Sequence, residues 1–294
     1  MDARTTVVVV TWRGRDHIAA CLRALAAQTR PHRTIVVDNA SDDGTAEILS
    51  TFDVETHRLP TNVGYAGALA TVRATTEFTA WLNDDAIPSP TWLAHLEDAL
   101  DATPSAAAAS AHLTQPDGTT QSLGVRLTPD GYGADAVTTP VFGFCGGAAL
   151  LRTAAVDGIP AHYFCYYEDT DTSWRMRLAG WTILAVPEAV VTHAHGASTA
   201  IGSPRFHLWN ERNRLWTLLR CAPRSVAWRE LARFAALTLI LPFRRITPKP
   251  PNFHFPLRAR VLAEVLTHLP RPHGTPTTRA RVWQEWTRPD DRTI

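Results

Sequence analysis

Strand and helix patterns alternate through the first hundred residues, and this alternation constrains the fold more than any other feature of the sequence. A continuous β-branched run at 7–11 is followed at 16–28 by apolar residues at the spacing of an amphipathic helix. Further strands are expected at 34–38, 54–59 and 78–82, and further helices at 45–51, 64–76 and 91–102. Repeated strand–helix units predict an α/β fold, with a mostly parallel sheet flanked by helices.

The rest of the chain carries weaker patterns. Ser89 and Pro90 are expected to cap and open the helix at 91–102, and the small, polar stretch 104–140 is expected to form loops with weak strands. A helix after Thr170 should end at Gly180, because glycine can adopt the left-handed conformation that ends helices. Strands within 183–191 and helices at 206–220 and 227–241 follow, and a Pro-rich tail begins at 242. We therefore expect one domain at 1–220 and a helical, Pro-rich C-terminal extension at 221–294.

Composition and charge exclude several classes of protein. With 45% hydrophobic and 19% charged positions, the 294-residue chain can bury a large core. Its 29 Lys and Arg nearly balance 28 Asp and Glu, so no overall basic field attracts nucleic acid or anionic lipid. The first apolar run is too short, and too soon followed by Arg13 and Arg15, to belong to a signal peptide. Four scattered cysteines suggest neither a disulfide framework nor a zinc site, so we expect reduced thiols in a cytoplasmic protein.

Polar residues after the second and fourth strands are the first site candidates, because α/β sheets bind ligands beyond the carboxyl ends of their strands. Asp38 either holds a nucleoside through its carboxylate or only shapes the turn. Asn83, Asp84 and Asp85 follow the fourth strand. Adjacent carboxylates repel unless a cation compensates, so this segment is either a Mg²⁺ or Mn²⁺ site for a diphosphate or a solvated acidic turn.

Two later segments supply a candidate base and a candidate metal ligand. Glu168, Asp169 and Asp171 precede a helix, where one of them acts as a general base or all three only complement the positive helix N-terminus. His193 or His195 either completes a metal shell or is an ordinary surface or core histidine.

Glycines and the C-terminal helices leave further alternatives open. The loop with Gly146 and Gly147 either lets backbone approach a ligand or forms a tight turn, and Gly64 is similarly placed. Arg212 either binds phosphate or lies on a solvated helix face. The apolar run 228–241, followed by 243–245, is too short to span a bilayer. We expect it to pack on the first domain or in a homodimer, with contact to a membrane surface as the alternative.

Six segments together resemble the family 2 glycosyltransferases of the GT-A fold, especially the rhamnosyltransferase-like branch. They lie in the family's order, at 8–12, 37–45, 62–66, 83–85, 168–175 and 193–198. The resemblance covers about 5–220 and implies a GT-A, Rossmann-like catalytic domain, with a nucleotide-sugar half at about 1–100 and an acceptor half at about 101–220. It also implies an inverting glycosyltransferase of the hexosyltransferase type, which displaces the nucleotide diphosphate directly at the anomeric carbon.

The resemblance implies a role for each matching residue. Asp169 is the implied catalytic base, and Asp85 is the implied main metal contact, because Asn83 replaces the first acid of the family's Asp-x-Asp motif. His193 is the matching histidine ligand, and His195 is the reserve candidate. Nucleotide-sugar contacts are implied for Thr11, Asp38, Asn62, Gly64, Asn83, Asp84, Gly146, Gly147, Glu168 and Arg212.

The branch favours a dTDP-deoxysugar donor such as dTDP-rhamnose, or a UDP-sugar, with Mg²⁺ or Mn²⁺ as cofactor. The acceptor would be a glycan, a lipid-linked sugar or a small molecule, and the protein would be cytoplasmic or peripheral at the inner face of a membrane. Two other functions stay open from the sequence: a nucleotide-sugar-binding module without turnover, and a nucleotidyltransferase. The latter would need a Gly-rich triphosphate loop near the first strand, which residues 11–15 approximate only faintly.

Overall fold

The computed structural model describes residues 3–193, 202–243 and 250–287. The chain divides into two compact units. The first unit consists of residues 1–126 and 135–197, and the second consists of residues 127–134 and 198–294.

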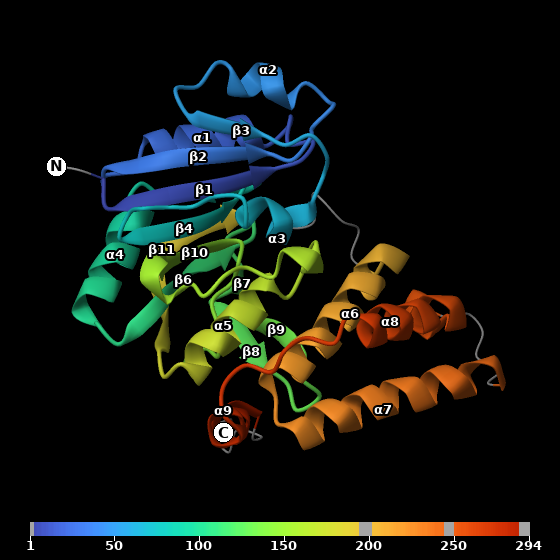
Figure 1. Cartoon of the computed structure of the whole chain (residues 1–294). Helices are drawn as coiled ribbons and strands as arrows, with labels where there is room; N and C mark the ends of the chain where they lie inside the picture. The colour runs from blue at the N-terminus through green and yellow to red at the C-terminus, as the bar shows by residue number, and fades with distance from the viewer. Residues whose placement is uncertain (1–2, 194–201, 244–249, 288–294) are drawn as a thin grey trace. The chain divides into compact units, whose positions relative to one another are not determined.

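A mixed sheet forms the centre of the first unit (Figure 1). Its first half is parallel, in the order β3-β2-β1-β4, with strands Glu55–Arg58, His32–Asp38, Thr5–Thr11 and Phe78–Asn83. The order continues β10-β6-β11-β5, with strands Ala148–Arg152, Ala106–Thr114, Thr182–His193 and Ala86–Pro88. β10 is antiparallel to both of its neighbours, and the short strand β7 (Thr120–Ser122) pairs with β6. The predicted α/β fold is confirmed.

Alternating side chains of the strands bury two cores, one on each face of the sheet. Val7 and Val9 of β1 point to one face, which is covered by α1 (Ile18–Ala26) and α4 (Trp92–Ala102). Val8 and Val10 point to the other, which contains residues of α3 (Gly64–Leu69) and α5 (Glu168–Leu178). A short helix α2 (Thr45–Leu49) links β2 to β3. Because β1 is buried on both faces, its unbroken valine run is explained.

The first part of the stretch 104–140 was predicted wrongly. This part is β6, a nine-residue strand that lies between β10 and β11, and not a loop with weak strands. Four consecutive alanines from Ala106 to Ala109 are fully buried there. Alanine has a low strand propensity, so packing between neighbouring strands overrides the local preference at this position.

Two helix boundaries also differ from the prediction. α3 ends at Leu69 and does not reach residue 76, and the hydroxyl of Thr71 there donates to the Ala68 carbonyl. Ser89 does not cap α4: the N-cap position is Thr91, and the Ser89 carbonyl accepts the Trp92 N–H. The predicted stop at Gly180 is confirmed, with a φ of +93° just after α5.

The second unit is helical. Ser203 caps α6 (Pro204–Cys221) by accepting the Phe206 N–H, and α7 (Arg224–Ile240), α8 (Phe255–Thr267) and α9 (Pro276–Thr287) follow. α8 and α9 form within the segment predicted as a Pro-rich tail. The unit also includes 127–134, at the turn of the β8–β9 hairpin (Gly124–Leu127 and Gly133–Ala136), where Tyr132 donates to Glu211 at 2.7 Å.

Two further features concern the cysteines and the helices. All four cysteines are free thiols. Within the described residues, none of the helices combines the length and apolar character needed to cross a bilayer.

Candidate active site

The carboxyl ends of β1, β2 and β4 bring the first group of predicted site residues together. Thr11 is the register partner of Asp38, and Val10 is the partner of Asn83. The Thr11 hydroxyl donates to Asp84 Oδ2 at 2.6 Å, and both side chains are buried. The ends of these three parallel strands therefore meet in one polar cluster.

Asp84 is enclosed by the loop that follows β1. A Cβ at Gly14 would lie 2.1 Å from Thr11 Oγ1 and 2.5 Å from Asp84 Oδ2, so no side chain fits there. Burial raises the pKa of Asp84 to about 6, against the lowering effect of the Thr11 hydrogen bond. Such a carboxylate gains from any positive charge placed nearby.

Asp85 and His193 form a buried pair. Asp85 Oδ1 lies 3.1 Å from His193 Nε2, and both side chains are 7% exposed. They meet because the last residue of β11, His193, pairs with Ala86 at the start of β5. Burial alone would raise the pKa of Asp85, but the hydrogen bond and charge of His193 outweigh it and lower that pKa. Asp85 is therefore ionised at neutral pH.

Two amide side chains orient the imidazole ring of His193. The Asn83 amide nitrogen lies 3.1 Å from Nε2, and Gln121 Oε1 lies 3.1 Å from Nδ1. An amide oxygen can only accept, so Nδ1 carries a proton. A neutral His193 therefore has its lone pair on Nε2, whereas the doubly protonated ring donates from Nε2 to Asp85. Gln121, on β7, was missed from the sequence, because nothing local distinguishes it from other polar residues in a turn-rich stretch.

The Asp85–His193 pair fits a divalent cation. In the neutral ring the Nε2 lone pair faces the ionised Asp85 oxygen at 3.1 Å, and a divalent cation between the two would take the place of the Nε2 proton. Neighbouring ligands of an octahedral ion with bonds of about 2.1 Å lie about 3 Å apart, which matches this separation. Within the described residues, no cluster of three or more His, Cys, Asp or Glu side chains has metal-binding geometry.

Asp169 lies at the start of α5 with three hydrogen bonds. Its Oδ2 accepts the Gly146 N–H at 3.0 Å, and its Oδ1 accepts the backbone N–H and hydroxyl of Thr170 at 2.5 and 3.1 Å. Burial raises the pKa of Asp169, and burial next to Asp169 raises the pKa of Glu168 to about 8. The three acids of this segment have different surroundings. Asp171 forms a buried ion pair with Arg175 at 2.8 Å, whereas Asp169 accepts hydrogen bonds from backbone and hydroxyl groups.

The loop with Gly146 and Gly147 connects Asp169 to the acidic turn. The Asn83 N–H donates to the Gly147 carbonyl at 3.0 Å, and the Tyr65 hydroxyl donates to the Gly146 carbonyl at 2.8 Å. A Cβ at Gly146 would lie 3.2 Å from the Asp169 Cβ. Hydrogen bonds thus run from Asp169 through this loop to Asn83 and on to His193, whose neighbour is Asp85.

The residues predicted to bind the nucleoside lie at the end of β2 and near the start of α3. Asp38 Oδ1 accepts the Ser41 N–H at 2.9 Å, which is the turn role, while its buried Oδ2 has only the Arg58 guanidinium at 3.4 Å. Asn62 accepts the Gly64 N–H at 2.8 Å. The close approach expected at Gly64 is made to Phe164, because a Cβ there would lie 2.2 Å from the Phe164 carbonyl oxygen.

Two predicted candidates lie outside the described part of the first unit. Arg212 belongs to the second unit, where it pairs with Glu264 at 2.7 Å and lies over the Trp216 ring. His195 lies outside the described residues.

Comparisons with known proteins bear on the family and the fold of this chain. A family model described as Glycosyl transferase family 2 matches residues 6–159. The chain is 29% identical, over 76% of its length and 85% of the relative's, to an N-acetylglucosaminyl-diphospho-decaprenol L-rhamnosyltransferase of Mycobacterium tuberculosis.

Solved structures of low identity share the fold. A mannosyltransferase of Pyrobaculum calidifontis, in complex with GDP-Man and Mn²⁺, has a TM-score of 0.53 at 20% identity, over 97% of this chain and 80% of its own. S. aureus TarS 1–349 in complex with UDP-GlcNAc has a TM-score of 0.57 at 19% identity, over 91% of this chain and 82% of its own. The predicted GT-A fold and rhamnosyltransferase-like relationship are confirmed.

Proposed function

This chain belongs to glycosyl transferase family 2 and is a glycosyltransferase, and from that premise we propose an inverting, metal-assisted transfer from a nucleotide diphosphate sugar to an acceptor hydroxyl. The observation that carries the proposal is the buried Asp85–His193 pair at 3.1 Å, linked through Asn83 and the glycine loop to Asp169. Membership in this glycosyltransferase family disfavours the two other functions that the sequence left open, a binding module without turnover and a nucleotidyltransferase.

Asp85 and His193 would hold Mg²⁺ or Mn²⁺. Such ions are often bound through one or two protein side chains, with substrate phosphates and water completing the shell, which suits a two-ligand site. When bound, the ion supplies neutralisation of the charge that develops on the departing diphosphate. Gln121 and Asn83 hold the ring of His193 with its lone pair toward Asp85.

Asp169 would act as the general base. Its raised pKa makes it a better proton acceptor than an ordinary aspartate, and its three hydrogen bonds fix its orientation. The acceptor oxygen forms a bond to the anomeric carbon, the bond from that carbon to the diphosphate oxygen breaks, and the acceptor proton goes to Asp169. Attack from the side opposite the leaving group inverts the anomeric configuration.

The remaining predicted residues would bind the donor. Asp38 Oδ2 is a buried acceptor at the edge of the sheet and suits a nucleobase or ribose donor group. Thr11 and Asp84 stand between this position and the metal pair, where they suit the ribose or the donor sugar. Glu168, Asn62, Gly64 and the loop of Gly146 and Gly147 surround these positions, while the phosphate role of Arg212 stays a prediction. We place the transfer chemistry in the first unit, which contains all of these residues except Arg212.

The relatives guide the choice of substrates. The name of the mycobacterial relative suggests a rhamnose donor and a lipid-linked sugar diphosphate as the acceptor. The resemblance noted from the sequence favours a dTDP-deoxysugar such as dTDP-rhamnose, with a UDP-sugar as the second choice of donor. Four free thiols support a cytoplasmic protein that would meet such an acceptor at the inner face of a membrane.

A metal-dependent binding screen tests the proposal. UDP, dTDP and GDP are each added with and without Mn²⁺, and the thermal unfolding midpoint is measured, because a ligand that prefers the folded state raises it. We expect one nucleotide to stabilise the protein only with metal, and D85A and H193A to abolish that effect. D98A, which removes an exposed acid paired with Arg30, is the matched control. Equal stabilisation of D85A and wild type would refute the metal site, and a retained anomeric configuration in the product, measured by NMR, would refute inversion.

A further inference from the structure

Helix α7 of the second unit exposes several large apolar side chains. Trp228 is 51% exposed, Leu239 66% and Ile240 46%, and Phe243 just beyond the helix is 86% exposed. Ala232 and Ala236 lie between them at helical spacing and are also exposed. An exposed stripe of this length, with its largest side chains apolar, is unusual for a helix that only packs on its own domain.

The inner side of α7 buries apolar and polar side chains together. Val226, Ala227, Leu231 and Phe234 are buried there with Glu230 and Thr238, and Arg214 lies 3.6 Å from Glu230. The helix therefore already has a packed apolar side, and the outward stripe is a second apolar surface.

Charge is strongly segregated between the two units. The second unit contains 17 Lys and Arg and 7 Asp and Glu, a net charge of +10, and the first unit carries −9, so the overall value of +1 conceals the contrast. Three of the arginines, Arg224, Arg229 and Arg233, are exposed on α7 and border the apolar stripe. The conclusion from composition, that no overall basic field attracts anionic lipid, applies to the whole chain and does not cover this unit taken by itself.

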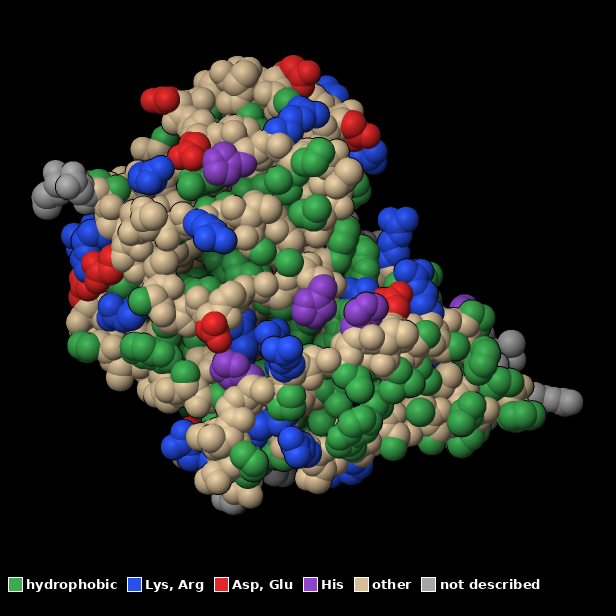
Figure 2. Space-filling view, viewed as in Figure 1, with side chains coloured by type: hydrophobic (Ala, Val, Ile, Leu, Met, Phe, Trp, Pro, Cys, Tyr) green, Lys and Arg blue, Asp and Glu red, His purple; other side chains and the backbone are tan. Residues whose placement is uncertain are grey.

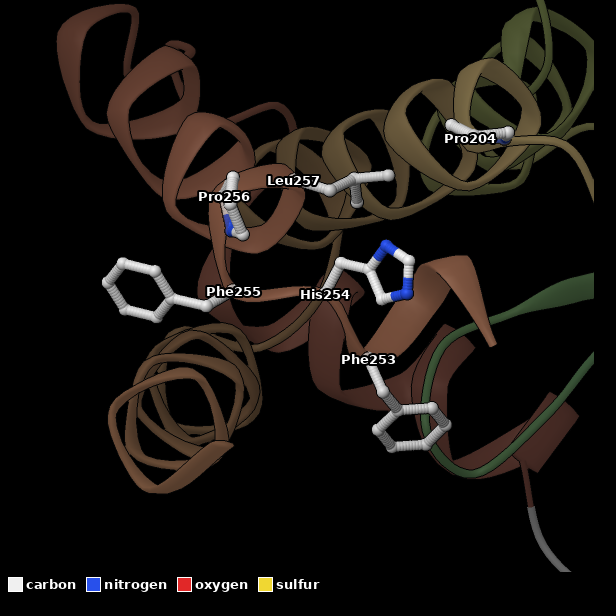
Figure 3. A pocket seen from close by; sticks show the side chains of 6 residues that line it. All are labelled: Pro204, Phe253, His254, Phe255, Pro256 and Leu257. Atoms are coloured by element: carbon white, nitrogen blue, oxygen red, sulfur yellow. The ribbon is translucent and has the colours of Figure 1, made fainter. Parts of the chain in front are cut away.

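Helix α8 adds further apolar surface. Leu266 is 55% exposed and Phe255 is 43% exposed, and Figure 2 shows hydrophobic side chains gathered over the region of α7 and α8. A hollow of about 460 Å³ at the start of α8 is lined by Pro204 and 253–257. Figure 3 shows Phe255 pointing away from the other labelled side chains of this hollow.

We propose that the α7 stripe and Phe243 dock the second unit onto the surface of a bilayer that contains anionic lipid. Apolar side chains would enter the boundary between headgroups and acyl chains, and the bordering arginines would meet the phosphates. The charge selects this occupant, because two copies of a unit with net charge +10 repel each other when brought face to face. The inference goes beyond the transfer reaction. Vesicle binding needs neither donor nor acceptor, so the membrane proposal and the proposed function can fail independently of each other.

Vesicle flotation with the full chain tests the docking surface. Vesicles of phosphatidylcholine alone are compared with vesicles that contain roughly one third phosphatidylglycerol, at low and at high salt. We expect at least about tenfold stronger partition onto the anionic vesicles, and a loss of about tenfold at high salt. The double variant L239E/F243E should lower partition by at least about tenfold, because it removes the apolar contribution and adds negative charge.

Two controls keep the outcome interpretable. V137E introduces one glutamate at an exposed apolar position of the first unit and should partition like wild type. Both variants replace exposed side chains, so their thermal unfolding and metal-dependent nucleotide binding should match wild type. The proposal is overturned if wild type ignores anionic vesicles or if L239E/F243E binds them equally well. It is also overturned if light scattering shows a dimer that this double variant dissociates.

Discussion

Gln121 is the sharpest test of how the site is organised, because sequence patterns did not point to it. Its Oε1 accepts the Nδ1 proton of His193 at 3.1 Å and so leaves the Nε2 lone pair toward Asp85. Loss of an outer-shell partner typically lowers metal affinity by about 10–100-fold, or about 1.4–2.7 kcal/mol. Gln121 is only half-buried, so water can replace part of its contact. We therefore expect Q121L to weaken Mn²⁺ binding by about tenfold, at the lower end of this range.

Calorimetric titration of Mn²⁺ into the protein with saturating nucleotide measures this loss. Q121E keeps an acceptor at the same reach and should bind Mn²⁺ at least as tightly as wild type. T120V is the matched control, because the Thr120 hydroxyl on the same strand contacts His112 at 2.9 Å and not the metal pair. If folded Q121L binds Mn²⁺ as tightly as T120V, the orienting role of Gln121 is wrong.

Three further perturbations address Asp169 as the proposed base, the neighbouring Glu168, and Gly14 beside Asp84. D169N should lower turnover by about 10²–10⁴-fold with metal–nucleotide affinity retained, and unchanged turnover would remove Asp169 from the base role. Folding raises the pKa of Glu168 from 4.5 to about 8, so the folded chain holds a proton that the unfolded chain releases. The free energy of unfolding without ligand should therefore fall as pH rises from about 4.5 to 8, and E168Q should flatten this slope in pH-resolved denaturation. G14A should separate Thr11 from Asp84 and destabilise the protein by about 1–3 kcal/mol, and an unchanged denaturation midpoint would mean that the loop adapts freely.

Sequence patterns predicted those parts of the fold that depend on neighbouring residues. The valine run of β1 and the apolar periodicity of α1 are local signals, and both elements form where they were expected. The prediction missed β6 because its alanines carry no strand signal, and only pairing with the neighbouring strands β10 and β11 makes this segment a strand. The prediction also missed α8 and α9, because the prolines around them favoured a tail without helices.

The sequence by itself determined the parallel β–α order and the carboxylates at the strand ends, because both are written in short-range patterns of hydrophobicity and turn chemistry. Only the tertiary structure decided that Gln121 and Asp85 meet on opposite nitrogens of His193, since these residues come from β7, the turn between β4 and β5, and β11. It also separated Asp171, bound to Arg175, from Asp169, although the two are near neighbours in one acidic segment. Burial and long-range pairing assign different roles to identical side chains, and neither is visible until the sheet is assembled.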